Sequence, residues 1–85
     1  MLFILCRRLR PQDRSWLQRE EKPQLVALGQ ALLSDFSALP ASSTVIALQE
    51  EVKETGLVPQ FEGEVSLKSG SELMDLMLET ELVHL

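Results

Sequence analysis

Residues 44–56, TVIALQEEVKETG, decide the fold class of this chain. The apolar run from Thr44 to Leu48 is typical of a buried strand, and it continues without a break into a helical segment. That segment starts with Glu50 and Glu51, whose charges suit the positive end of a helix, and it stops at Gly56. A strand joined directly to a helix in this way is the repeating unit of a parallel sheet.

The same alternation extends over the whole chain. We expect strands at 2–6, 25–28, 44–48, 64–68 and 82–85, and helices at 12–18, 30–39, 49–56 and 70–80, with a loop at 57–63. Short connections between strands and helices favour a parallel sheet with helices on both faces. The sequence therefore predicts one α/β domain, residues 1–85: a three-layer α/β/α fold with a mostly parallel sheet of about five short strands.

Three of the expected helices carry specific signals. In the helix at 12–18, Trp16 and Leu17 are the expected apolar contacts with the core. In the helix at 30–39 the apolar residues recur at helical spacing, and Pro40 stops the helix. Ser69 and Glu72 fit a capping box at the start of the last helix.

Composition limits where the protein acts. The apolar fraction is 45% and the charged fraction is 25%, as in ordinary globular proteins. One cysteine excludes an internal disulfide framework, which fits a reducing compartment. The first stretch, MLFILCRRLR, has too short an apolar run for an export signal, and its arginines follow that run. We expect a soluble, cytoplasmic protein with no membrane association.

Charge is distributed unevenly. The net charge is −5, yet six of the eight basic residues lie within residues 1–22. Nucleic-acid affinity depends on neutralising phosphates, so we expect no direct nucleic-acid binding by this chain alone. The basic end then has three interpretations: a solvated surface, one edge of a composite site, or a contact with an acidic face of a neighbouring subunit.

Cys6 is the one candidate for catalytic chemistry. It ends the first expected strand, and sites in parallel sheets form beyond such ends. Arg7 and Arg8 follow it and favour the thiolate that attacks a persulfide. The alternative is that Cys6 packs in the core as a small apolar side chain.

The other polar groups offer less. His84 lacks further ligands at metal-binding spacing, so we expect no metal, and no motif indicates a cofactor. Glu50 and Glu51 point in different directions on a helix, so we interpret them as helix-start residues and not as an acid–base pair.

The helix at 70–80 has an apolar surface wider than an ordinary amphipathic stripe. It covers either an unusually deep core or another subunit. The interface candidates are Leu73, Met74, Met77 and Leu78.

In this order of elements the chain resembles the DsrH/TusB family of DsrEFH-like sulfur-relay proteins. The resemblance covers nearly the whole chain and is strongest from Val45 to Val83, in VIALQEEVKETGL and VSLKSGSELMDLMLETELVHL. It implies a sulfur-relay subunit that helps to pass persulfide sulfur toward 2-thiouridine at the tRNA wobble position. It also implies paralogous DsrE/DsrF-like (TusD/TusC-like) partners, one of which holds the principal sulfur-carrying cysteine.

The chain departs from the family at two places. Some members carry a cysteine on the first helix, where this chain has serine near the expected place, and serine forms no persulfide. The turn after the second strand reads Gly29-Gln30-Ala31, without the usual acidic residue or Asn before Gly. Because the resemblance implies that a partner holds the principal carrier cysteine, we expect an accessory subunit without independent enzymatic activity, at most a persulfide carrier. The alternative, which the missing cysteine on the first helix favours, is a stand-alone, self-associating binding module of the same fold.

Overall fold

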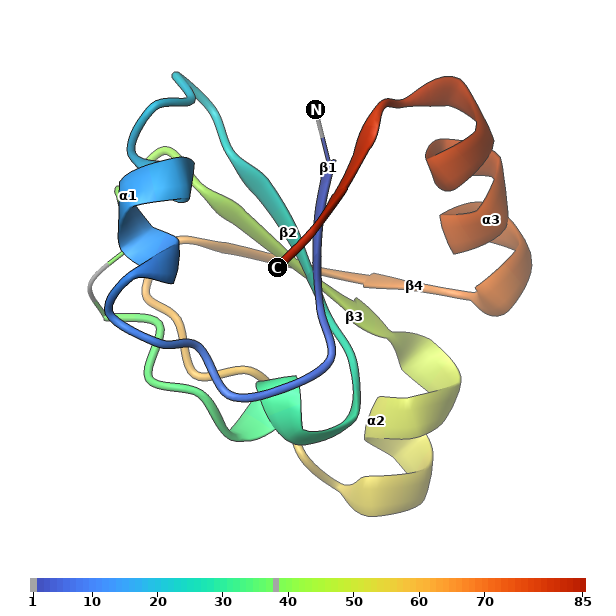
Figure 1. Cartoon of the computed structure of the whole chain (residues 1–85). Helices are drawn as coiled ribbons and strands as arrows, with labels where there is room; N and C mark the ends of the chain where they lie inside the picture. The colour runs from blue at the N-terminus through green and yellow to red at the C-terminus, as the bar shows by residue number, and fades with distance from the viewer. Residues whose placement is uncertain (1, 38) are drawn as a thin grey trace.

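A five-stranded, all-parallel sheet forms the centre of the molecule (Figure 1). The computed structural model describes residues 2–37 and 39–85, apart from the side chain of Arg14. The elements in chain order are β1 (Leu2–Leu5), α1 (Asp13–Leu17), β2 (Gln24–Ala27), the 3-10 helix η1 (Gly29–Leu33), β3 (Thr44–Leu48), α2 (Gln49–Thr55), β4 (Glu64–Lys68), α3 (Gly70–Glu79) and β5 (Leu82–His84). The predicted α/β class is confirmed.

The strand order is β4-β3-β2-β1-β5. β1 pairs with β2 on one side and with β5 on the other, and all four of its residues are buried. A continuous apolar run is what a strand covered on both faces requires, because neither face meets water. β1 is therefore an interior strand with a neighbour on each side, and the strand expected at the start of the chain is confirmed.

Strand register sorts the buried side chains into two clusters, one on each face of the sheet. Phe3, Leu25 and Val45 are neighbours in register and belong to the first cluster, together with Leu17 of α1. Ile4, Val26 and Ile46 form the second cluster with Leu73 of α3. Figure 1 accordingly shows α1 and α3 on opposite sides of the strands.

The expected helix at 30–39 is wrong. Among the described residues of this segment, the short η1 is the helical part, and Ser34 then adopts extended backbone angles. The buried Ser34 hydroxyl accepts a hydrogen bond from the Leu9 N–H at 2.8 Å, and the Ser37 N–H donates to Asp35 Oδ1 at 3.0 Å. Serine and aspartate side chains thus bond backbone groups outside a helical ladder, which is why such residues favour turns.

The first helix is confirmed as α1, but only one of its two expected core contacts is correct. Leu17 is fully buried, as expected, but Trp16 is 54% exposed and is not a core contact. The Arg19 guanidinium lies 5.2 Å from the centre of the Trp16 ring, at a distance typical of a cation–π contact. This contact gives the large indole a partner on the surface.

Both helix-boundary signals are confirmed. The Ser69 hydroxyl accepts from the Glu72 N–H, and Glu72 Oε1 accepts from the Ser69 N–H, which completes the capping box. Hydrogen bonds from the Ser69 backbone and hydroxyl lower the pKa of Glu72. At the end of α2, Gly56 has φ +73° and its N–H donates to the Val52 carbonyl at 2.8 Å.

Substitution of Gly56 tests this helix end. Gly56→Ala should lower the free energy of unfolding by about 1 kcal/mol, because a Cβ disfavours positive φ. Gly70→Ala is the matched control: Gly70 starts α3 without positive φ, and no atom lies within 4 Å of an added Cβ. The control should keep or raise stability in urea denaturation. Equal losses in both variants would contradict the prediction.

Candidate functional site

The carboxyl ends of the parallel strands meet at one edge of the sheet. Cys6 follows β1, Gly29 follows β2, α2 follows β3 directly, and Ser69 follows β4. In open parallel sheets this edge is the usual place for ligands and reactive groups. We refer to it as the carboxyl edge.

Cys6 is exposed, so the interpretation of it as a buried packing residue is wrong. The buried run ends one residue earlier, at Leu5, whose carbonyl accepts a hydrogen bond from the Leu28 N–H at 3.0 Å. The chain bends immediately after this bond, and the thiol lies outside both clusters. The carboxyl edge thus presents an accessible sulfur atom.

Arg7 and Asp13 fix the segment that follows Cys6. The Arg7 guanidinium donates two hydrogen bonds to the buried Asp13 carboxylate, at 2.8 and 3.0 Å, and the Arg10 N–H adds a third at 2.9 Å. The Arg7 bond, with help from the Arg10 N–H, holds the pKa of Asp13 below its usual range against the opposing effect of burial. The charge of Arg7 is therefore engaged by Asp13, and an effect of the arginines on the thiol stays a prediction.

Glu50 and Glu51 lie in the first turn of α2, as expected, but they also join different elements. Glu51 Oε1 accepts a hydrogen bond from the Gly29 N–H at 2.7 Å, at the start of η1. Glu50 Oε1 accepts one from the Gly70 N–H at 3.3 Å, at the start of α3. The two carboxylates thus bond the N-terminal N–H groups of neighbouring helices, where negative charge is favourable. These long-range contacts have no signal in the sequence.

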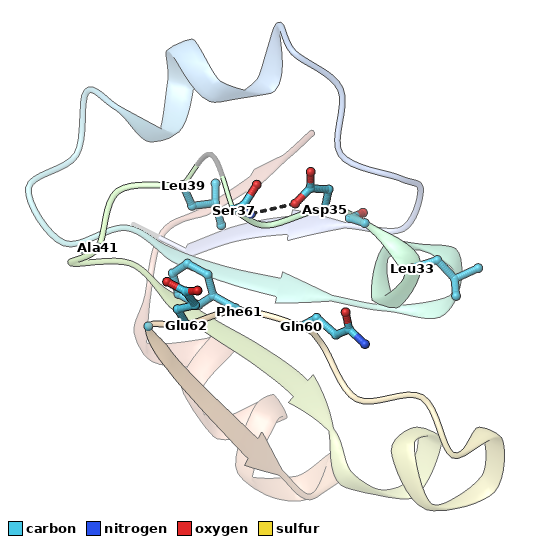
Figure 2. A pocket seen from close by; sticks show the side chains of 10 residues that line it. Leu33, Asp35, Ser37, Leu39, Ala41, Gln60, Phe61 and Glu62 are labelled. Atoms are coloured by element: carbon cyan, nitrogen blue, oxygen red, sulfur yellow. Dashed lines mark hydrogen bonds between the residues drawn. The ribbon is translucent and has the colours of Figure 1, made fainter.

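A cavity of about 960 Å³ lies between the segment after η1 and the segment before β4 (Figure 2). Its lining residues are Leu33, Ser34, Asp35, Ser37, Leu39, Ala41, Gln60, Phe61, Glu62 and Gly63. The sequence does not predict this cavity, because its apolar spacing predicts a helix where the backbone turns extended after η1. The lining combines two carboxylates with hydroxyl and amide groups, which suits a polar ligand that is neutral or positively charged. Cys6 does not line this cavity.

The four interface candidates on α3 divide into two groups. Leu73 is buried, and Met77 is half-buried against the second cluster, so both are occupied by the chain's own core. Met74 is 63% exposed and Leu78 is 80% exposed. An interface role thus stays a prediction for Met74 and Leu78, which lie one turn apart on the outer surface of α3.

Within residues 2–37 and 39–85, no three His, Cys, Asp or Glu side chains form a group that fits a metal ion, and His84 is exposed on β5. In the same residues no helix has the length and apolar content to cross a membrane. Comparison with protein-family models and with curated proteins gave no match. The resemblance to the DsrH/TusB family therefore stays a prediction that rests on the residues that carry it.

Asp13 makes a testable contribution to stability. Asp13→Asn should lower the free energy of unfolding at neutral pH by about 2 kcal/mol, because it weakens charged hydrogen bonds at a buried site. The lowered pKa means that this contribution is complete above the ordinary value of 3.8 and is lost as pH falls through the folded-state pKa. The stability curves of the two proteins should therefore converge in acid.

Urea denaturation at a series of pH values measures both effects. Asp75→Asn, which changes an exposed carboxylate on α3, is the control and should alter stability by less than about 0.5 kcal/mol. A difference between wild type and Asp13→Asn that does not vary with pH would contradict the assigned role of Asp13.

Proposed function

We propose that this chain is an accessory subunit of a cytoplasmic sulfur-relay complex that passes persulfide sulfur toward 2-thiolation of the tRNA wobble uridine. The observation that carries the proposal is the accessible Cys6 thiol at the carboxyl edge, directly after the interior strand β1. The sequence resemblance from Val45 to Val83 supplies the pathway. The five-stranded parallel sheet is compatible with that resemblance.

The chemistry at Cys6 needs no cofactor. The Cys6 thiolate attacks the outer sulfur of a donor persulfide, so a bond forms between Sγ and that sulfur while the donor's own S–S bond breaks. The donor leaves as a thiolate and takes up a proton. Oxidised and reduced sulfur balance, because the persulfide is transferred and not created. A second attack by a partner thiol would pass the sulfur on in the same way.

Assembly is the other part of the proposed role. Met74 and Leu78 present apolar side chains to solvent on α3, and exposed apolar patches often mark protein interfaces. Methionine adapts readily to the shape of a partner. In this proposal paralogous DsrE/DsrF-like subunits cover the outer surface of α3, and the principal sulfur carrier belongs to one of them.

The second candidate is a stand-alone, self-associating binding module. The cavity of about 960 Å³ favours it, because the polar residues Asp35, Gln60 and Glu62 line the cavity and Cys6 does not. In this alternative the fold is retained without relay chemistry. The two candidates differ in whether the thiol is needed.

Persulfide uptake tests Cys6 directly. The reduced, folded chain should gain the mass of one sulfur atom when it is incubated with a low-molecular-weight persulfide, as measured by intact-mass spectrometry. The Cys6→Ala variant should gain none. Loss of uptake on folding, seen as labelling in denaturant but not in native buffer, would remove Cys6 as a persulfide site.

The complex itself is the wider test. We expect the chain to co-purify from its native cell with two small homologous α/β proteins, and sulfur transfer by those proteins should fall when the chain is omitted. Isolation of the chain without any such partner, under conditions that preserve complexes, would contradict the relay proposal and favour the binding module.

Substitutions on α3 separate assembly from folding. Leu78→Asp and Met74→Asp should abolish co-purification of partners while changing the free energy of unfolding by less than about 1 kcal/mol, because both side chains are exposed. Leu73→Asp is the contrasting variant and should unfold the chain, since it places a charge in the second cluster. Retention of partners by both surface variants would show that the outer surface of α3 is not the interface.

A further inference from the structure

β4 is an edge strand with one side unpaired in the described sheet. Its five residues, EVSLK, pair in full register with β3, and the strand order places β4 at the end of the sheet. Glu64 is exposed and Leu67 is 47% exposed. An edge strand of this kind is a template for pairing with another strand.

The sequence of β4 is complementary to itself when two copies run antiparallel. With Ser66 on a two-fold axis, Glu64 of one copy lies opposite Lys68 of the other, and Val65 lies opposite Leu67. Side chains directly opposite in an antiparallel pair share a face of the sheet. Each acid therefore meets a base on one face, and each apolar side chain meets an apolar side chain on the other.

We propose that β4 pairs antiparallel with β4 of a second copy of this chain and joins the two sheets into one continuous sheet across a two-fold axis. Such an interface is isologous, so each favourable contact occurs twice. The proposal does not depend on the sulfur-relay function, because neither Cys6 nor the outer surface of α3 takes part in it.

The charged ends of β4 are available for this pairing. Among the described residues, neither Glu64 nor Lys68 forms a salt bridge within the chain. Glu64 Oε2 accepts a hydrogen bond from the Thr44 hydroxyl at 3.2 Å, and the other carboxylate oxygen accepts none from the residues that the structure describes. Two ion pairs per dimer therefore form without the loss of a described salt bridge, beside the attraction of Lys68 for the Glu72 carboxylate that helps to lower the pKa of Glu72.

A second copy fits this edge better than an unrelated strand. An antiparallel partner needs a base opposite Glu64, apolar residues opposite Val65 and Leu67, and an acid opposite Lys68. β4 itself meets all of these requirements in one register. A shift by one residue would place apolar side chains opposite charged ones, so the alternation also fixes the register.

Charge reversal provides the test. The wild-type chain should dimerise in sedimentation equilibrium across a concentration series. Glu64→Lys and Lys68→Glu should each raise the dimer dissociation constant about tenfold or more, because two cross-strand ion pairs become like-charge pairs. The double variant, Glu64→Lys with Lys68→Glu, should restore dimerisation, since the opposite charges have only exchanged places.

The design contains its own controls for folding. The double variant carries both local changes of the single variants, so its recovery excludes misfolding as the cause of their loss. Lys53→Glu, an exposed reversal on α2, should leave the dissociation constant unchanged. A monomeric wild-type chain, unaffected single variants, or a double variant as weak as either single one would each overturn the proposal.

A covalent capture gives an independent readout. In a Cys6→Ala background, Ser66→Cys places one thiol on each side of the proposed axis, so mild oxidation should yield a disulfide-linked dimer. Ser71→Cys, at an exposed site in the first turn of α3, is the matched control and should cross-link much less. Equal cross-linking of the two variants would count against pairing through β4.

Discussion

The constraint on which this structure depends is that a parallel sheet must be covered on both faces. Every strand pair here is parallel, so the apolar side chains of β1, β2 and β3 project to both sides and need partners on each. In a chain of 85 residues, helices are few and short. α3 supplies the helical cover of one face, and α1, η1, Val52 of α2 and irregular segments with Phe36 and Phe61 share the other. Because so few helical residues cover the sheet, the edge strand β4 and the outer surface of α3 are left exposed to solvent.

Much of the fold was predictable because the interior strands are continuous apolar runs, and such runs are stable only when both faces of the sheet are covered. The runs at β1 and β3 have no polar face, which indicates burial on both sides. The start of α3 at Ser69 and the end of α2 at Gly56 were also predicted correctly, because both depend on hydrogen bonds between residues close in sequence. The segment after η1 was not, because its apolar spacing is helical while its conformation is set by a bond from the distant Leu9 N–H to Ser34.

The position of Cys6 in the fold was predictable from the sequence, but its exposure and the contacts around it were not. Topology places Cys6 at the carboxyl edge, and the sequence anticipated that place. The sequence left the exposure of the thiol undecided. A strand one residue longer would bury Cys6, whereas the observed strand ends at Leu5 and Cys6 is exposed. The hydrogen bonds from Gly29 to Glu51 and from Gly70 to Glu50 could not be predicted, because they depend on how distant segments of the chain pack together. These carboxylates bond the starts of η1 and α3, and the Cys6 thiol beside them is exposed.

The outer surface of α3 and the edge strand β4 are both exposed because the chain has few elements to cover them. They differ in how specifically each can bind a partner. Met74 and Leu78 form an apolar surface that accepts many partners of suitable shape. β4 is more selective, because alternating charge and apolar residues on a strand define both a direction and a register for whatever pairs with it. Lysine on an edge strand also discourages indiscriminate pairing. An edge that repels most strands and complements its own sequence therefore restricts self-association to one arrangement, and it leaves the outer surface of α3 open to a different subunit.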